Sequence, residues 1–315
     1  MSPLAERMRP VTLDDYIGQE HLVGQGAILR KSIETGVLPS LIFWGPPGVG
    51  KTTLAGIIAK QLRRPFYVLS AISSGVKDVR DVIDRAQKYA GELKEVPGNP
   101  ILFIDEIHRF SKSQQDALLP YVEEGVLTLV GATTRSGLLT APLLSRFAIK
   151  SRLEYYPAST LKKIVLRAAA ILQVPISEDA AGEIARRSRG TPRIANGLLR
   201  RVRDFAQVLN DGNIDIGITQ HALKALNVDE HGLDDMDNRI LSTIIEKFKG
   251  GPVGITTIAT AVGEEAGTLE EVYEPFLIQE GFIKRTPRGR EATDKAYIHL
   301  GKNPFQGNEK PTLFD

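Results

Sequence analysis

The sequence contains no cysteine, and this absence removes several classes of chemistry. Disulfide bonds, thiolate metal sites and cysteine nucleophiles are all excluded, and the composition fits a reducing cytosol. No apolar run approaches the roughly 20 residues that a membrane span needs, and the N-terminus lacks the pattern of a signal peptide. We therefore expect a cytoplasmic protein that does not bind a membrane.

An excess of charge and a cluster of histidines are also missing. The net charge of +2 is too small to indicate nucleic-acid binding by itself, so any DNA contact must come from local basic clusters. The five histidines are scattered without the spacing of metal ligands, and we interpret His108 as a loop or packing residue. A length of 315 residues with 42% hydrophobic side chains allows two or three domains with a sizeable core.

The most informative segment is residues 45–52, which read GPPGVGKT and match the phosphate-binding pattern G-x-x-x-x-G-K-T. The apolar run 41–44 precedes it and a helical segment 53–63 follows, so the glycines lie at a strand-to-helix turn. Backbone N–H groups there can surround a polyphosphate. Lys51 would reach the terminal phosphates and Thr52 would hold Mg²⁺, which predicts ATP as the ligand. The predicted nucleotide-binding residues here are Gly45, Pro47, Gly48, Val49, Gly50, Lys51, Thr52 and Thr53.

A second functional element, an acidic pair, follows about fifty residues later. The apolar run 101–104 is typical of a buried strand and ends in Asp105 and Glu106. The carboxyl end of a parallel strand lies beside the phosphate loop in a doubly wound sheet. Asp105 would bind the metal, and Glu106 would orient and deprotonate the attacking water. Alone, such a pair is usually a solvated loop, but after a phosphate loop it indicates a hydrolytic site.

The chain divides by pattern into three domains. Alternating strands and helices predict an α/β domain over 1–155, with a doubly wound parallel sheet. A helical domain over 156–233 and a third unit over 234–302 follow, and 303–315 is predicted to be a tail. The predicted strands lie near 41–44, 66–69, 101–104 and 127–131, and a helix is predicted over 113–123.

The later segments have their own helix signals. Residues 161–172 have helical apolar spacing, Ser177 can cap a helix over 178–189, and Pro192 can start another. Helices near 236–248, 255–263 and 268–280 precede a strand over 282–285 and a Pro-Arg-Gly turn. This order is typical of a winged helix, a variant of the helix-turn-helix.

Together these features resemble the AAA+ ATPases over nearly the whole chain. From about residue 130 the motifs resemble the RuvB family of Holliday-junction branch-migration motors: GATTRSG (131–137), APLLSRF (141–147), LEYY (153–156), RGTPR (189–193), RRVRDFA (200–206) and KRTPRGR (284–290). The first third is similar to the clamp-loader-like RarA (MgsA) ATPases: PLAERMRP (3–10), LSA (69–71), SGVK (74–77), HRF (108–110) and QQDALLP (114–120). The two resemblances meet near 131–134, which leads to the interpretation of a hybrid chain.

The resemblance implies roles for further residues. Thr134 would be a polar sensor of the γ-phosphate, although a Thr at this place can also cap a turn. Arg146 would be an arginine finger that reaches a neighbouring subunit, and its alternative is a surface salt bridge. Arg193, after Pro192, would be a second sensor. Met8, Arg9, Pro10, Ile17 and Tyr156 would frame the adenine, with core packing as the alternative for Ile17 and Tyr156.

The resemblance also implies partners. A RuvB-type chain would form a homo-oligomeric ring, a hexamer, that hydrolyses ATP to move branched DNA. Such chains carry a β-hairpin that docks RuvA, but only about two dozen residues separate Glu106 from Gly131 here, and a predicted helix uses most of them. Coupling to RuvA is therefore in doubt. The alternatives are a RarA-like replication-fork ATPase and an ATP-switched DNA-binding scaffold with little turnover.

A local basic cluster lies on the predicted wing. It consists of Lys284, Arg285, Arg288 and Arg290, on a turn that can project toward phosphates. The preceding helix carries Glu270, Glu271, Glu274 and Glu280, and this acidity argues against insertion into a major groove. We therefore predict backbone-directed DNA binding, with a purely structural winged helix as the alternative. Seven arginines between 186 and 203 are interpreted as a solvated helical face.

Overall fold

The computed structural model of the chain describes residues 4–92 and 98–304, so the predicted tail lies almost wholly outside the described residues. The chain divides into two compact units, 1–200 and 201–315, whose boundary falls within helix α11 (Pro192–Leu209). The helical domain predicted for 156–233 is therefore shared between the two units. No helix in the described part of the chain is long and apolar enough to cross a bilayer.

A five-stranded parallel sheet forms the centre of the first unit, in the order β2-β3-β4-β1-β5. Its strands are β1 (Leu41–Trp44), β2 (Phe66–Ser70), β3 (Ile101–Asp105), β4 (Thr128–Thr133) and β5 (Ile149–Arg152). The four predicted strands are confirmed. The fifth was missed because it lies at the sheet edge and carries Lys150, Ser151 and Arg152, which break the apolar run on which the prediction depended.

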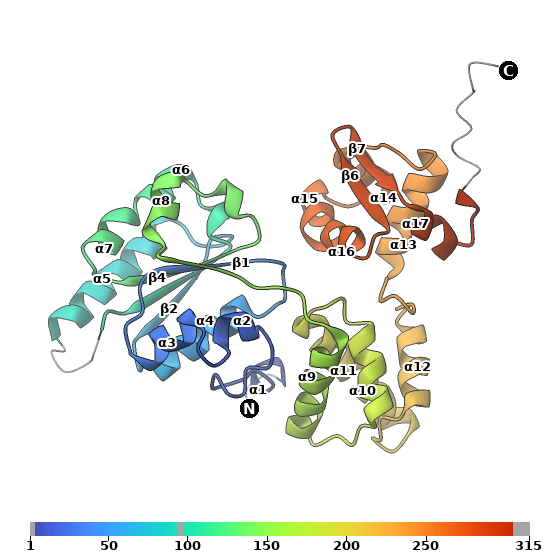
Figure 1. Cartoon of the computed structure of the whole chain (residues 1–315), viewed down its shortest axis with the longest axis horizontal. Helices are drawn as coiled ribbons and strands as arrows, with labels where there is room; N and C mark the ends of the chain where they lie inside the picture. Colours follow the sequence, from blue (N-terminus) through green and yellow to red (C-terminus); the bar gives the residue numbers. More distant parts are fainter. Residues whose placement is uncertain (1–3, 93–97, 305–315) are drawn as a thin grey trace. The chain divides into compact units, whose positions relative to one another are not determined.

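Helices cover both faces of this sheet (Figure 1). Helices α3 and α4 lie on one face, and α5, α6, α7 and α8 lie on the other. The helical elements of the first unit are α1 (Leu4–Arg7), α2 (Glu20–Val23), α3 (Ile28–Glu34), α4 (Lys51–Gln61), α5 (Val76–Glu92), η1 (Ile107–Arg109), α6 (Lys112–Asp116), α7 (Leu119–Glu123), η2 (Ser136–Leu138), α8 (Ala141–Arg146), α9 (Ala158–Leu172), α10 (Glu178–Arg186) and most of α11. The predicted doubly wound α/β class is confirmed.

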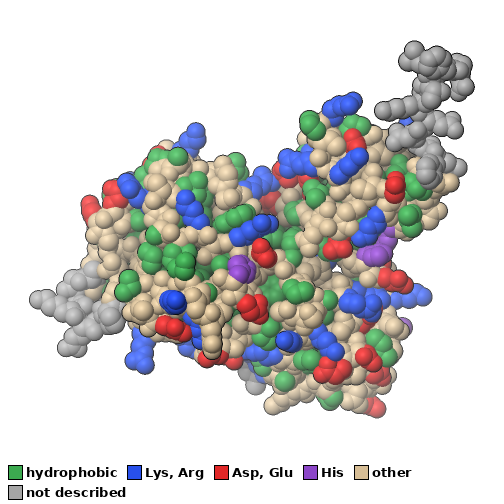
Figure 2. Space-filling model, in the orientation of Figure 1, with side chains coloured by type: hydrophobic (Ala, Val, Ile, Leu, Met, Phe, Trp, Pro, Cys, Tyr) green, Lys and Arg blue, Asp and Glu red, His purple; other side chains and the backbone are tan. Residues whose placement is uncertain are grey.

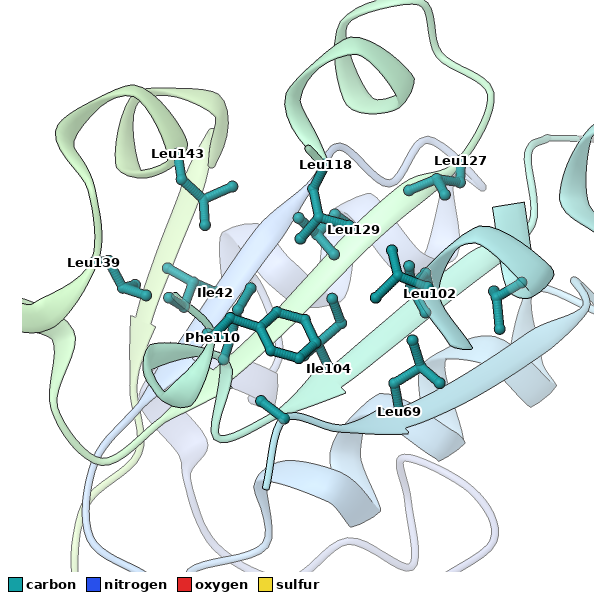
Figure 3. Packing of buried hydrophobic residues seen from close by; sticks show 14 of the residues in the cluster. Ile42, Leu69, Leu102, Ile104, Phe110, Leu118, Leu127, Leu129, Leu139 and Leu143 are labelled. Atoms are coloured by element: carbon teal, nitrogen blue, oxygen red, sulfur yellow. The ribbon is translucent and has the colours of Figure 1, made fainter. Parts of the chain in front are cut away.

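One hydrophobic cluster fixes the sheet against α5 and α8 (Figure 3). Strand residues Leu102, Ile104 and Leu129 are fully buried in it, together with Leu118 and Leu143 from the helical side. Each such side chain contributes roughly 1.5–3 kcal/mol by leaving water. The cluster holds β3 and β4 in place up to the residues at which they end.

The single helix predicted over 113–123 is broken in two. Ser111 and Gln114 form a capping box that starts α6, and α6 ends at Asp116. Pro120 is the second residue of α7; it has no N–H to continue a helix from α6, so a new helix begins after the buried Leu118. Residues 106–127 are all described and contain no strand. The predicted absence of a hairpin between Glu106 and Gly131 is therefore confirmed.

The second unit contains the end of α11 and α12, and then three helical segments followed by a β-hairpin, which is the predicted winged-helix order. Its elements are α12 (Ile216–Ala225), α13 (Asp235–Ser242), η3 (Thr243–Lys247), α14 (Ile255–Val262), α15 (Ala266–Thr268), η4 (Leu269–Tyr273), α16 (Glu274–Gln279), β6 (Ile283–Thr286), β7 (Gly289–Ala292) and α17 (Asp294–His299). Strands β6 and β7 are antiparallel, and their register pairs Arg285 with Arg290. Leu241, Ile244, Leu277 and Phe282 are fully buried in the core of this unit.

A buried ion pair joins the wing to α16. Arg290 is 8% exposed, and its Nε and Nη2 donate to the two carboxylate oxygens of Glu274 at 3.2 and 2.9 Å. From the sequence we expected Glu274 to add to the acidity of the helix surface. It does not, because the residue is only 4% exposed. This bidentate pair holds β7 against α16.

We expect Arg290→Ala to lower the free energy of unfolding of the second unit by about 3–5 kcal/mol, because it removes the bidentate partner of a buried carboxylate and leaves only Arg285, at 4.0 Å. Differential scanning calorimetry can measure this loss. Arg288→Ala is the matched control, since Arg288 is exposed on the same turn and should cost less than about 0.5 kcal/mol. Equal transition temperatures for the two variants would contradict the structural role of the pair.

Candidate active site

A pocket of about 330 Å³ opens in the first unit beside the phosphate loop. The structure brings most of the predicted nucleotide-binding residues to its walls: Met8, Arg9, Pro10, Ile17, Pro47, Gly48, Gly50, Lys51, Thr52, Thr53, Asp105, Glu106, Tyr156, Pro192 and Arg193. Its size lies within the range of small-molecule sites. Four predicted residues do not line it: Gly45, Val49, Thr134 and Arg146.

The phosphate loop has a backbone that only glycine allows at two tight places. Gly50 has a φ of 103°, and a Cβ there would lie 2.9 Å from the Tyr16 hydroxyl oxygen. Gly45 has a φ of 143°, and a Cβ there would lie 2.2 Å from the carbonyl oxygen of Leu153. The loop then enters α4, whose first N–H groups have no partner within the helix and can bind an anion.

Lys51 lies under the loop rather than in solvent. Its Nζ donates to the carbonyl oxygens of Gly45 and Pro46, both at 2.8 Å, and the residue is 6% exposed. Burial lowers the pKa of Lys51 to about 8, although the carboxylates of Glu106 and Asp105 oppose this shift. An anion that enters the pocket would therefore stabilise the protonated amine.

The oxygen atoms of Thr52 and Asp105 meet at the carboxyl end of β3. The Thr52 hydroxyl donates to Asp105 Oδ2 at 3.4 Å, and Asp105 Oδ1 accepts from the N–H of Glu106 at 3.1 Å. Hydroxyl and carboxylate oxygens suit Mg²⁺, which keeps several waters and shares its shell with phosphates. Among the described residues no three His, Cys, Asp or Glu side chains could hold a metal. Such a pair fits a cation that arrives with a nucleotide.

Glu106 is bound to the end of the neighbouring strand β4. Its Oε2 accepts from Thr134 N at 3.3 Å and from Thr134 Oγ1 at 3.1 Å. The sensor predicted at Thr134 and the base predicted at Glu106 are therefore in direct contact. The Nδ1 of His108 lies 3.2 Å from the same oxygen, so the interpretation of His108 as a loop or packing residue missed this contact.

Two tyrosines form one wall of the pocket. The Tyr156 hydroxyl donates to the carbonyl oxygen of Val49 at 3.2 Å, and its oxygen lies 3.4 Å from the Tyr16 hydroxyl oxygen. Burial raises the pKa of both hydroxyls, so they stay neutral donors. Tyr156 is 5% exposed, so it is both packed and in contact with the phosphate loop.

Six wall residues were not predicted: Asp15, Tyr16, Ile164, Arg167, Asn196 and Arg200. A signal for two of them was present, because Asn196 and Arg200 follow Arg193 by three and seven residues on α11. That spacing places all three on one helix face. Arg167 reaches the pocket from α9 and donates to the carbonyl oxygen of Met8 at 3.0 Å, a contact that no local pattern announces.

Arg146 lies outside the pocket, at the last residue of α8. Its guanidinium forms an ion pair with Glu123 at the end of α7, and its side chain is 44% exposed. The expected alternative, a surface salt bridge, is therefore present in the single chain.

The four basic residues of the wing differ in their surroundings. Arg288 is exposed and has no ion-pair partner among the described residues, whereas Lys284 pairs with Glu291 at 2.9 Å. Arg285 is 60% exposed and 3.6 Å from Glu270. Arg290 is buried, and its Nε and Nη2 donate to Glu274, so fewer of its N–H groups are left for a phosphate. Figure 2 shows basic and acidic side chains interspersed over the visible surface, which agrees with the small net charge.

Comparisons with known proteins agree with this geometry. Residues 41–155 match the model of the ATPase family associated with various cellular activities (AAA). Residues 156–229 match the RuvB AAA lid domain, and residues 230–301 match the RuvB C-terminal winged helix domain.

Relatives extend over nearly the whole chain. The Holliday junction branch migration complex subunit RuvB of Christiangramia forsetii is 52% identical over 330 residues, covering 98% of this chain and 93% of its own. The subunit of Parabacteroides distasonis is 51% identical over 98% of this chain and 94% of its own. Because this coverage includes the first third of the chain, the comparisons give no support to the interpretation of a hybrid.

Solved structures of RuvB proteins are also similar to this chain. The Thermotoga maritima RuvB Holliday junction branch migration motor superposes with a TM-score of 0.86 at 44% identity, covering 94% of this chain and 99% of its own. A variant of that protein superposes with a TM-score of 0.85. The chain belongs to the RuvB family of AAA ATPases.

Proposed function

We propose that this protein is an ATP-driven motor that moves four-way DNA junctions during recombination and repair. The observation that carries the proposal is the meeting of Lys51, Asp105 and Glu106 in one pocket, in a chain that also has a winged helix. Relatives named as branch migration complex subunits support the choice of junction DNA. The protein would act in the cytoplasm.

Nucleotide binding would use the loop and the lid together. The triphosphate lies on the N–H groups of the loop and of α4, and Lys51 moves from the carbonyls of Gly45 and Pro46 to the phosphates. Arg193 approaches from the start of α11, and Tyr156 and Ile17 border the base. Thr52 and Asp105 would hold Mg²⁺, which neutralises phosphate charge when bound.

Hydrolysis would begin at the carboxyl end of β3. Glu106 takes a proton from the water that attacks the γ-phosphorus, and the bond from this phosphorus to the β–γ bridging oxygen breaks, so that ADP leaves. Thr134 fixes the carboxylate and the water. Arg146 of a neighbouring subunit stabilises the charge that develops on the phosphoryl group. This trans contribution requires a ring, and we propose a hexamer.

The exposed cations of the wing would hold DNA.

RuvA would not dock on this protein through a hairpin. Residues 106–127 form η1, α6 and α7 instead of a hairpin. The alignment with the Christiangramia forsetii relative has 330 positions, more than the 315 residues here, so the relative has additional residues. Stimulation of ATP turnover by a RuvA protein would contradict this proposal.

The two alternatives are less well supported. A RarA-like replication-fork ATPase lacks support from the relatives, which are RuvB subunits along 98% of the chain. A scaffold with little turnover does not need the contact between Glu106 and Thr134.

Glu106→Gln should retain ATP binding but reduce hydrolysis about 100-fold or more, because it removes the base. Branch migration of a synthetic four-way junction should stop with it. Glu124→Gln, at an exposed residue of the same unit, is the control and should keep both activities. Hydrolysis by Glu106→Gln within about threefold of the parent would sink the assignment.

Arg146→Ala should bind ATP as the parent does and yet fail to turn over in the assembly, because the finger acts on the neighbour. Mixing it with Lys51→Ala should restore activity, since one subunit supplies an intact pocket and the other an intact finger. Light scattering of the mixture checks that the two variants assemble together. Co-assembled rings no more active than either variant alone would refute the trans role.

ATP binding should take up a proton near pH 8.5. The pKa of Lys51 is lowered to about 8, so most of the amine is neutral at pH 8.5, and the bound phosphates raise that pKa again. Affinity should therefore fall as the pH rises above 8 and be insensitive to Lys51 below pH 7. Calorimetric titrations of a slowly hydrolysed ATP analogue in two buffers with different protonation enthalpies measure the uptake. Proton release at pH 8.5 would contradict the assignment.

Replacing Arg285 and Arg288 together with Ala should weaken binding to duplex DNA of every sequence. Removal of each cation that neutralises a phosphate should lower the slope of log K against log salt by about 0.9. Fluorescence anisotropy over a salt series measures both effects. Lys224→Ala, at an exposed residue of α12, is the control, and ATP turnover without DNA should not change in either variant. An unchanged affinity and slope would leave the wing as scaffold.

A further inference from the structure

Three polar groups converge on one oxygen atom of Glu106. Oε2 accepts from Thr134 N and Oγ1, and His108 Nδ1 lies 3.2 Å from it. No hydrogen bond joins Oε1 to any residue in 4–92 or 98–304. Glu106 itself lies on the pocket wall. The carboxylate is therefore fixed through one oxygen, and the other remains available to a proton from water.

The same nitrogen of His108 that lies near Glu106 is also in contact with Thr133. The side chain of His108 is 2% exposed, and its Nδ1 lies 2.9 Å from Thr133 Oγ1. Thr133 is fully buried and also accepts from the N–H of Arg135 at 2.9 Å. The imidazole thus joins η1, which directly follows Glu106, to the end of β4.

The contacts assign a proton to Nδ1. A lone pair on this nitrogen would face a carboxylate oxygen at 3.2 Å, which is repulsive, whereas an N–H can be shared between Glu106 Oε2 and Thr133 Oγ1. The imidazole carries this proton whether it is neutral or charged. It therefore acts on Glu106 as a donor.

We propose that His108 is a positioning residue for ATP hydrolysis, which orients Glu106 so that Oε1 faces the attacking water. The proposal rests on the proposed role of Glu106 as the base. A free carboxylate samples several rotamers, and only the one aimed at the water is productive. Thr134 holds Oε2 of Glu106 from one side, and His108 donates to the same oxygen from another direction.

Two variants separate the donor from the volume of the ring. His108→Asn places an amide N–H near the position of Nδ1, so it can replace the donor. His108→Gln places its amide near the position of Nε2, so it cannot do so without moving. The two side chains are both polar amides, so a difference between them does not come from polarity. His108→Leu adds a variant that has no donor at all.

Steady-state ATP hydrolysis by the full chain, with and without four-way junction DNA, gives kcat and KM for each variant. Loss of a supporting hydrogen bond of this kind commonly costs about 10–100-fold, so His108→Gln and His108→Leu should lose about that much in kcat. His108→Asn should stay within about threefold of the parent. Affinity for a slowly hydrolysed ATP analogue should not change, and the fluorescence of Trp44, the only tryptophan and the last residue of β1, can report it.

A double-variant cycle tests whether His108 acts through Glu106. In a Glu106→Gln background, His108→Leu should cause little further loss in single-turnover hydrolysis, because the group that it positions is already gone. A further loss as large as in the parent background would overturn the proposal. So would a His108→Leu variant that hydrolyses at the parent rate, or one that hydrolyses faster.

The control variants separate a failure of the role of His108 from a failure of the role of Glu106. If His108→Leu does not fold, as judged by its thermal transition, the Asn and Gln pair decides, and equal rates for these two would refute the proposal. If Glu106→Gln hydrolyses ATP normally, the role of Glu106 fails and the proposal fails with it. If Glu106→Gln is inactive while His108→Gln is normal, only the role of His108 fails.

Discussion

The alignment of three parallel strands is the constraint on which the rest of the active site depends. In the register of the sheet, Ile104 lies opposite Gly131, and Trp44 lies opposite Thr133. Strands β3, β4 and β1 therefore end at one edge, with about 4.8 Å between neighbours. The phosphate loop leaves from β1, the acidic pair from β3 and Thr134 from β4. Because side chains alternate between faces, a slip of one residue would turn each of them to the wrong side.

The core beneath the edge explains why this alignment holds. Leu102, Ile104 and Leu129 are buried on the face covered by α5 and α8, so β3 and β4 cannot slide without opening the cluster. The sheet thus works as a rigid base, and the proposed catalytic groups lie on the short segments that leave it. The contact between Glu106 and Thr134 is a direct product of this arrangement.

Charged side chains serve two separate purposes in the second unit. Arg290 and Glu274 are buried together and join β7 to α16, so they stabilise the wing. Arg285 and Arg288 are exposed near its turn, where a phosphate can reach them. A few exposed cations on a surface of mixed charge predict DNA binding that depends on salt and reads little sequence. The same heptapeptide, KRTPRGR, therefore contains both structural residues and residues that we propose to bind DNA.

Much of the fold was predictable because the signals were local. Strands β1, β3 and β4 are buried and largely apolar, and β2 is a largely apolar run at the sheet edge. Ser177 caps α10 through Ala180 N as its position suggested. The two predictions that failed did so for different reasons. Strand β5 is polar and exists because β1 pairs with it along the edge. The helix over 113–123 was broken by Pro120, whose effect competed with an otherwise helical pattern.

The sequence by itself determined the chemistry of the phosphate loop and of the acidic pair. Both depend on the order of neighbouring residues at a strand end, and the N–H groups of a Gly-rich loop that opens a helix can bind phosphate. Only the tertiary structure decided that His108 lies against Glu106, that Arg146 pairs with Glu123 and that Arg290 is buried. The pairs of Arg146 with Glu123 and of Arg290 with Glu274 join separate elements, and His108, although close to Glu106 in sequence, also contacts Thr133 at the end of β4. Their existence depends on the packing of whole elements, which no short stretch of sequence encodes.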